Sequence, residues 1–369
     1  MIAQSHLPSL AIMGFRGIRS LEIDNLGQVT LLAGKNGVGK TTILEAIQMF
    51  ASRGNRHTIL DLLDDREEFS SVKSAKGDKI LFPHCSSLFY GYNPENGDKL
   101  PSPIQITTTQ RNPRKVSLSL VEAKEERQNE ILDSESLYLN DILVSVDKHT
   151  RTFPIIPIEY SRRSLLFGPR FPSNPDGWPS SIALQSLGPG LPQNDKVAEL
   201  WDSIALTSSE EFVINALRLV TGTKLERLAV IGEGYRNRGR QMVAKLSFAP
   251  QPVPLKRLGD GAQRLLGIAL ALANCQNGIL LIDEIENGIH YSILHKLWDM
   301  IFQAARDGNI QVIAVTHSWD CISSFAHSAI ATDQVGTLVR LEEGEDGLYP
   351  VHYSEEDLKI AADQHIEVR

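Results

Sequence analysis

The sequence GKNGVGKT, which runs from Gly34 to Thr41, matches the pattern GxxxxGK[ST] at every fixed position. An apolar run from Val29 to Ala33 precedes it, and a helical pattern of apolar residues follows it as far as Phe50. A strand, a glycine-rich loop and a helix in this order turn successive backbone N–H groups toward an anion. The sequence therefore predicts a phosphate-binding loop at the start of this helix.

This loop predicts a site for a nucleoside triphosphate with Mg²⁺. Lys40 is expected to reach the β- and γ-phosphates, and Thr41 to bind the metal ion. Other loop residues and the first helical turn are expected to surround the phosphates: Gly34, Gly37, Val38, Gly39 and Thr42. The alternative is a chance glycine turn, and the flanking strand and helix argue against it.

A second apolar run, Ile279 to Ile282, ends in the carboxylates Asp283 and Glu284, which is the pattern of a Walker B strand. We expect Asp283 to complete the Mg²⁺ shell, usually through water, and Glu284 to accept a proton from the attacking water. The alternative is a buried strand that simply ends at the solvent. The phosphate-binding loop in the same chain favours the metal-binding interpretation.

Two further segments extend this pattern. The apolar run Val312 to Val315 is followed by Thr316 and His317. A lone histidine is more often structural, but a position after the Walker B strand favours contact with the γ-phosphate. Upstream, the residues LGDGAQR, from Leu258 to Arg264, open an apolar helix some 20 residues before Walker B. In isolation, a turn and a helix cap would explain its glycines equally well.

This arrangement resembles the ABC-class ATPases, in which an LSGGQ-type signature lies just ahead of Walker B. Gly259 and Asp260 replace the usual serine and glycine, so the resemblance implies that backbone N–H groups from Gly259 to Gly261 hold the γ-phosphate. The nucleotide is then ATP. Each ATP would lie between Lys40 of one subunit and this segment of another, in a head-to-tail dimer.

Within that class the sequence is similar to the OLD and RecF-like branch, and most closely to bacterial defence-associated AAA ATPases. The matching residues are Phe15-Arg16-Gly17-Ile18, Asn36, the stretch from Asp283 to His290, and the stretch from Thr316 to Cys321. The resemblance implies that Asn36 helps to hold the γ-phosphate and that Glu286 to His290 form a D-loop. OLD nucleases also carry a TOPRIM domain with a DxD motif. The 38 residues after Ala331 contain no DxD motif, so we expect no nuclease in this chain.

The predicted fold is an α/β ABC-type P-loop NTPase with an antiparallel β lobe, an inserted small helical lobe and no long coiled coil. The expected divisions are an N-terminal ATPase half at 1–60, the β lobe at 61–158, the helical lobe with a basic segment at 159–253, and a C-terminal ATPase half at 254–369. The strand from Ile155 to Tyr160, followed by Ser161-Arg162-Arg163, is the expected neighbourhood of the Q-loop.

Composition narrows the functional classes. The 369 residues are 42% hydrophobic and carry a net charge of −8, which suits a globular protein and not a strongly basic nucleic-acid module. The longest uncharged apolar stretch, Leu265 to Cys275, is shorter than the roughly 18 residues of a membrane span. The N-terminus lacks signal-peptide features and the three cysteines form no CxxC pair, so we expect a cytoplasmic location without disulfides.

Three interpretations of function stay open. The first is an ATP-driven sensor or scaffold in anti-phage defence, with a separately encoded effector that we expect to be a nuclease. The second is a DNA repair or recombination ATPase that contacts DNA through Lys224 to Arg257, a segment with eight basic and two acidic residues. That segment could equally be a solvated hairpin. The third is a nucleotide-bound scaffold without hydrolysis, which Glu284 argues against, and a transporter ATPase fits least.

Overall fold

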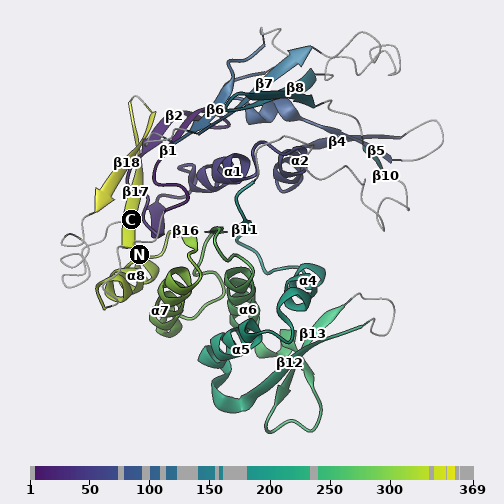
Figure 1. The fold of residues 1–369 in the computed structure, drawn as a ribbon, viewed down its shortest axis with the longest axis vertical. Helices are drawn as coiled ribbons and strands as arrows, with labels where there is room; N and C mark the ends of the chain where they lie inside the picture. Colours follow the sequence, from purple (N-terminus) through teal and green to yellow (C-terminus); the bar gives the residue numbers. More distant parts are fainter. Residues whose placement is uncertain are drawn as a thin grey trace.

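The computed structural model describes residues 5–73, 79–93, 100–108, 114–122, 140–153, 158–160, 181–232, 240–331, 336–345, 347–353 and 357. In these residues the chain forms a central sheet with a β lobe on one side and helices on the other (Figure 1). No helix of the described part is both long and apolar enough to cross a membrane.

The central sheet has the strand order β11-β15-β16-β3-β17-β18. The first five strands are parallel and β18 is antiparallel to β17. The strands are β3 (Val29–Gly34), β11 (Leu184–Leu187), β15 (Ile279–Ile282), β16 (Gln311–Val315), β17 (Gly336–Gly344) and β18 (Gly347–Tyr353). Every residue of β3, β15 and β16 is buried, which explains why these strands are continuous apolar runs.

Alternate residues of these strands pack into two different cores. Leu32, Leu281 and Ile313 join α1 (Lys40–Ala51) and the β lobe in one core. Their neighbours Leu31 and Leu280 join the second core with three helices on the opposite face (Figure 1). These helices are α6 (Asp260–Ala273), α7 (Tyr291–Asp307) and α8 (Trp319–Ala331). Burial on both faces fixes the register of the strands and hence the edge at which their carboxyl ends meet.

The β lobe is a six-stranded antiparallel sheet of order β2-β1-β6-β7-β8-β9, next to a three-stranded sheet of order β10-β5-β4. Its elements are β1 (Leu10–Phe15), β2 (Ile18–Ile23), α2 (Arg56–Asp64), β4 (Phe69–Lys73), β5 (Lys79–Pro83), η1 (Cys85–Leu88), β6 (Ile104–Thr107), β7 (Lys115–Glu122), β8 (Asn140–Val146), β9 (His149–Phe153) and β10 (Ile158–Tyr160). The lobe therefore includes β1 and β2, which precede the phosphate-binding loop, as well as the segment after α1.

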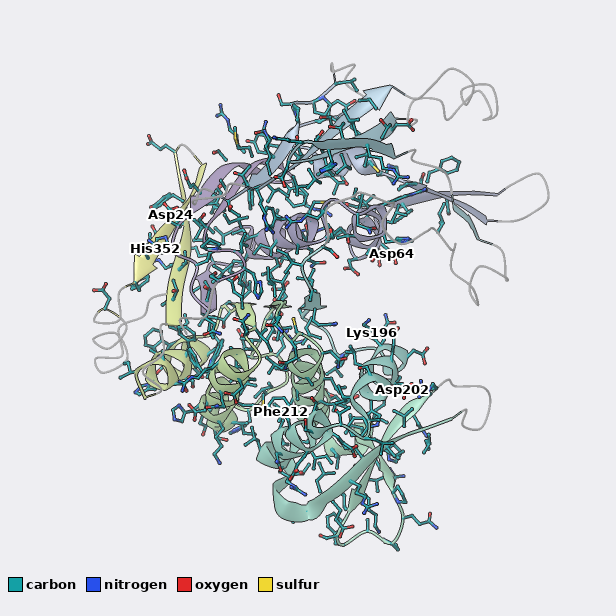
Figure 2. All side chains as sticks on the ribbon, viewed as in Figure 1. Asp24, Asp64, Lys196, Asp202, Phe212 and His352 are labelled. Carbon is teal, nitrogen blue, oxygen red and sulfur yellow. The ribbon has the colours of Figure 1, made fainter. Side chains whose placement is uncertain are left out.

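The helical lobe is inserted between the neighbouring strands β11 and β15, and it packs on α6 in a third core. It consists of α4 (Asn194–Ile204), α5 (Ser208–Thr221), η4 (Gly222–Lys224), β12 (Leu225–Ile231), β13 (Gln241–Leu246), β14 (Val253–Pro254) and η5 (Leu255–Leu258). Figure 2 shows Lys196 of α4 on the side turned toward α2. Burial and the neighbouring Asp65 raise the pKa of Asp61 in α2. The positive charge of Lys196, which belongs to the helical lobe, opposes this rise in the pKa of a residue of the β lobe.

Candidate nucleotide-binding site

The loop between β3 and α1 has a backbone that requires glycine. Gly34 has a φ of 142°, and a Cβ there would lie 2.8 Å from the carbonyl oxygen of Leu341 in β17. Gly39 has a φ of 104° and stands at the N-cap of α1 without any side-chain cap. The first N–H groups of α1 therefore face the loop interior without a competing side-chain acceptor, which is the arrangement that attracts phosphate.

Lys40 lies inside this loop, with 8% of the residue exposed. Its Nζ donates hydrogen bonds to the carbonyl oxygens of Gly34 at 2.6 Å and Lys35 at 2.8 Å. Burial lowers the pKa of Lys40, while the carboxylates of Asp283, Glu286 and Glu284 oppose this shift. The loop thus holds a buried ammonium group at its centre, and this group can attract an anionic phosphate.

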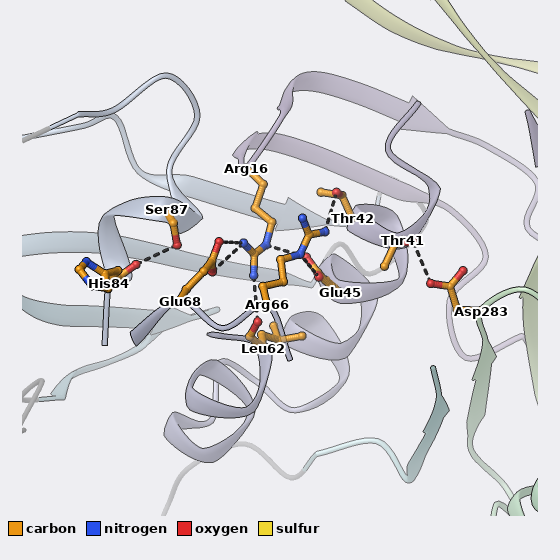
Figure 3. A network of polar contacts seen from close by, with 10 residues as sticks. All are labelled: Arg16, Thr41, Thr42, Glu45, Leu62, Arg66, Glu68, His84, Ser87 and Asp283. Carbon is orange, nitrogen blue, oxygen red and sulfur yellow. Dashed lines mark hydrogen bonds and ion pairs between the residues drawn. The ribbon is translucent and has the colours of Figure 1, made fainter. Parts of the chain in front are cut away.

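The predicted metal ligands meet across the sheet edge. The Oγ1 of Thr41 donates a hydrogen bond of 2.8 Å to Oδ2 of Asp283, although 242 positions separate the two residues (Figure 3). The other oxygen of Asp283, Oδ1, is buried and has no hydrogen-bond partner among the described residues. Burial raises the pKa of Asp283, and the hydrogen bond from Thr41 opposes that shift. A hydroxyl, a carboxylate and an unused buried oxygen suit Mg²⁺, which prefers oxygen ligands together with water and phosphate.

Glu284 follows directly and is half-buried at the same edge. Its φ of 46° is unusual for a residue other than glycine. Its side-chain Oε2 accepts a hydrogen bond from Nδ2 of Asn287, and its carbonyl oxygen accepts one from Arg264. The carboxylate therefore lies next to the proposed metal ligand, where a general base for the attacking water belongs.

Arg264 is a site residue that the sequence analysis missed. The residue is 1% exposed, and its guanidinium donates to four carbonyl oxygens. The acceptors are Gly188 at 2.6 Å and Gly190 at 3.0 Å in the loop after β11, and Asp283 at 2.5 Å and Glu284 at 3.1 Å. Burial lowers the pKa of Arg264, and the carboxylates of Asp283, Glu286 and Glu284 oppose the shift. The available signal was an arginine directly before the apolar part of the helix, which begins at Leu265.

The loop at Gly188, and not the stretch expected to hold the Q-loop, follows the strand next to Walker B. The strand beside Walker B is β11, whose carboxyl end leads into the helical lobe. By contrast, Ile158–Tyr160 pairs with β5 in the small sheet of the β lobe. Residues 155–157 and 161–163 of that expectation lie outside the described residues. The four residues of β11, LQSL, are half-buried or exposed, and so short a segment gave no sign of a parallel strand.

His317 follows β16, which lies between β15 and β3 in the sheet. Its backbone N–H donates to Oε1 of Glu286 at 3.1 Å, and its Nδ1 lies 3.5 Å from the same oxygen. The side chain is 41% exposed. The histidine is therefore fixed between the ends of the Walker A and Walker B strands, with exposed surface left for a ligand.

The signature segment lies against the D-loop of its own chain. Gly259 has a φ of 89° and precedes α6 without a side-chain cap. A Cβ on Gly261 would lie 2.8 Å from the carbonyl oxygen of Gly288. Among the described residues, no hydrogen bond joins Gly259, Asp260 or Gly261 to the phosphate-binding loop. Within one copy this segment therefore makes no hydrogen bond to the described phosphate-binding loop, and its contact with the loop of another copy stays a prediction.

Arg16 lies in a buried network behind the phosphate-binding helix (Figure 3). Its guanidinium pairs with Glu45 at 2.6 Å and Glu68 at 2.8 Å, and Arg66 pairs with Glu45 at 2.7 Å. Burial raises the pKa of Glu45, and Arg16 and Arg66 oppose the shift. Arg66 also donates to Thr42 Oγ1 at 3.4 Å. The network fastens α1 to β1 and α2 and so fixes the helix that presents the phosphate site.

A cavity of about 510 Å³ lies between this network, the phosphate-binding loop and the turn joining β17 to β18. Arg66 and Tyr90 line one side of it, and Gly344, Glu345, Gly347 and Leu348 line another. Its volume is in the range of small-molecule sites.

Comparisons with known proteins agree with this geometry. The chain is 23% identical over 336 residues to an "ATP/GTP phosphatase" of Helicobacter pylori, covering 86% of each. It is 37% identical over 83 residues to the DNA replication and repair protein RecF of Rickettsia prowazekii, covering 22% of this chain and 23% of RecF. The crystal structure of an Smc head bound to the C-winged helix domain of ScpA matches with a TM-score of 0.50 at 14% identity, over 96% of this chain and 100% of that chain. This likeness confirms the predicted ABC-type P-loop fold.

A family model described as "AAA domain, putative AbiEii toxin, Type IV TA system" matches residues 29–320. The match begins at β3 and extends past His317, so it includes both Walker motifs and the signature segment. The chain belongs to this AAA-domain family, and it is an ATPase.

Proposed function

We propose that this ATPase is a Mg²⁺-dependent switch whose nucleotide is shared between two copies of the chain. The observation that carries the proposal is the hydrogen bond between Thr41 and Asp283, with Glu284 beside it. Bound Mg²⁺ would be held by these two residues and would neutralise phosphate charge. Glu284 would accept the proton of the attacking water.

The remaining residues of the site would bind and sense the triphosphate. Lys40 and the N-terminus of α1 attract the β- and γ-phosphates, and Asn36 is exposed on the loop beside them. His317 would contact the γ-phosphate from the adjacent strand end. The cavity beside Arg66 and Tyr90 is large enough for the nucleoside. Loss of the γ-phosphate would then alter contacts at the ends of three strands.

A head-to-tail dimer would complete the site with Gly259, Asp260 and Gly261 of the other copy. The uncapped start of α6 supports this arrangement, because its N–H groups can bind the γ-phosphate. Exposed D-loop residues beside it, Gly288 and His290, offer contact surface for the second copy. ATP would hold the two copies together, and hydrolysis would release them.

We infer that the output comes from a separately encoded effector in anti-phage defence, for which a nuclease is our expectation, and that the system acts in the cytoplasm. The family description supports a role in such a multi-protein system, since it names a toxin–antitoxin system. The affiliation with the OLD-like branch rests on the sequence resemblance. The ATPase would then act as the sensor or scaffold that controls the effector.

A DNA repair or recombination ATPase is the second candidate, and one observation favours it. Phe248, in the basic segment from Lys224 to Arg257, is 68% exposed, and Lys224 Nζ lies 5.8 Å from its ring centroid. An exposed ring with a cation could stack on a nucleic-acid base. Against this, Arg240 of the same segment already pairs with Asp202.

Phosphate release from Mg²⁺-ATP over a protein dilution series, with and without duplex DNA, tests both candidates. The Glu284→Gln variant provides the blank. Specific activity that falls on dilution supports the shared site, and stimulation by DNA favours the second candidate. Turnover equal to that of the blank under every condition would contradict the hydrolytic switch and leave a nucleotide-held scaffold.

A further inference from the structure

We propose that Asn287 is a positioning residue for the general base Glu284. The inference rests on the proposed function, since it takes Glu284 as the group that accepts the proton of water. Asn287 lies in the D-loop, three positions after Glu284, and no role was predicted for it. Its side-chain amide contacts the carboxylate directly.

The backbone of Glu284 is held in place by its neighbours. Its φ of 46° lies in the left-handed region, which residues other than glycine adopt only when the surrounding structure enforces it. The carbonyl oxygen of Glu284 accepts from Arg264 at 3.1 Å and from the N–H of Asn287 at 3.0 Å. The N–H of Ile285 donates to Val315 at 3.1 Å. These bonds fix the direction in which the glutamate side chain leaves the backbone.

The side-chain amide of Asn287 then fixes the carboxylate itself. Nδ2 donates to Oε2 of Glu284 and, at 3.3 Å, to the carbonyl oxygen of Pro189. Pro189 lies between the two glycines whose carbonyls accept from Arg264. The amide therefore ties the carboxylate to a loop that is itself anchored. In the described residues no other hydrogen bond reaches the carboxylate, so Oε1 is left to accept from water.

The position of this amide also depends on the signature helix. The carbonyl of Gly288, next to Asn287, packs against Gly261 at the start of α6. Arg264 extends from the same helix to the carbonyl of Glu284. Contacts with α6 therefore fix the positions of both the D-loop and the general base. A base held to within a fraction of an ångström is what efficient proton transfer requires.

The test is the steady-state kinetics of Asn287→Ala. Because Asn287 is only half-buried, we expect this variant to fold. Loss of a positioning contact predicts that kcat falls about 10-fold to 100-fold while KM and ATP affinity stay unchanged. Asn287→Gln keeps an amide donor and should recover part of the loss. Gln303→Ala is the matched control, because it removes an amide-to-carboxylate hydrogen bond, to Asp307, on the surface of α7.

A double-mutant cycle separates positioning from a general structural role. In the Glu284→Gln background, Asn287→Ala should cause no further loss of the residual turnover, because the base is already absent. An additive loss, a loss of ATP affinity, or a kcat equal to or above that of the unmodified chain would overturn the inference while Glu284→Gln keeps only its residual turnover. Full turnover by Glu284→Gln would instead contradict the proposed function itself.

Discussion

Gly261 offers a direct test of the contact between the signature segment and the D-loop. It is the second residue of α6, and its backbone lies against the carbonyl of Gly288. Replacement by alanine adds a single methyl group at a position where a helix otherwise accepts alanine well. The substitution therefore perturbs one packing contact and leaves the charge of the site unchanged.

The size of the effect follows from the distances. The new Cβ would lie 2.8 Å from the Gly288 oxygen, and ordinary contact begins at 3.4 Å, so the two segments must separate by about 0.6 Å. Overpacking of this kind costs about 1–3 kcal/mol of unfolding free energy, and the helix propensity of alanine offsets at most about 1 kcal/mol. Because a misplacement of about 1 Å can cost on the order of 100-fold in rate, we expect kcat to fall about 10-fold.

Phosphate release at saturating Mg²⁺-ATP and a thermal unfolding curve measure the two effects. Gly232→Ala is the matched control, because a Cβ there meets no atom of the described residues within 4 Å. Gly261→Ala with an unchanged kcat and an unchanged Tm would refute the reasoning. It would mean that the signature segment and the D-loop separate without consequence for the general base.

Three further predictions concern the phosphate and metal residues. Lys40→Ala should abolish nucleotide binding in equilibrium dialysis, because it removes the ammonium group at the centre of the loop. Glu284→Gln should bind ATP with only residual turnover, and a dimer should accumulate in size-exclusion chromatography with ATP; a monomer under these conditions would contradict the shared site. Asp283→Asn should raise the Tm of the nucleotide-free chain at pH 7 and abolish Mg²⁺-dependent binding. Burial raises the pKa of Asp283 above its ordinary 3.8, so its charge opposes folding at neutral pH. The gain in Tm should shrink as the pH falls through that raised pKa, where the native carboxylate becomes protonated.

The positions of the predicted phosphate and metal residues could be inferred because these residues follow locally recognisable strands. The apolar runs of β3, β15 and β16 are parallel strands, and parallel strands place their carboxyl ends at one edge. Thr41 and Asp283 were therefore expected to lie close together, and the hydrogen bond between them shows that they do. Here a short pattern in the sequence was enough to predict a contact between distant residues.

The parts that could not be predicted depend on contacts without a local pattern. The role of Arg264 could not be predicted from its helix, because one of its acceptors is the carbonyl oxygen of Gly188, 76 positions away. The strand β11 is short and polar, so its place beside Walker B appears only in the sheet order. Phe248 was not recognised as an exposed ring in the basic segment, because its exposure depends on how the sheet of β12, β13 and β14 packs.

Arg264 provides a route by which ATP bound at one site would affect hydrolysis at the other site of the dimer. α6 begins with the segment expected to contact the γ-phosphate of the other copy, and one turn later it carries Arg264. A helix moves as a rigid element over so short a distance. A shift of its first turn toward the other copy's nucleotide must therefore move the guanidinium that holds the carbonyls of Asp283 and Glu284. Since these two residues would bind the metal and accept the proton, ATP at one interface would set the geometry for hydrolysis at the other.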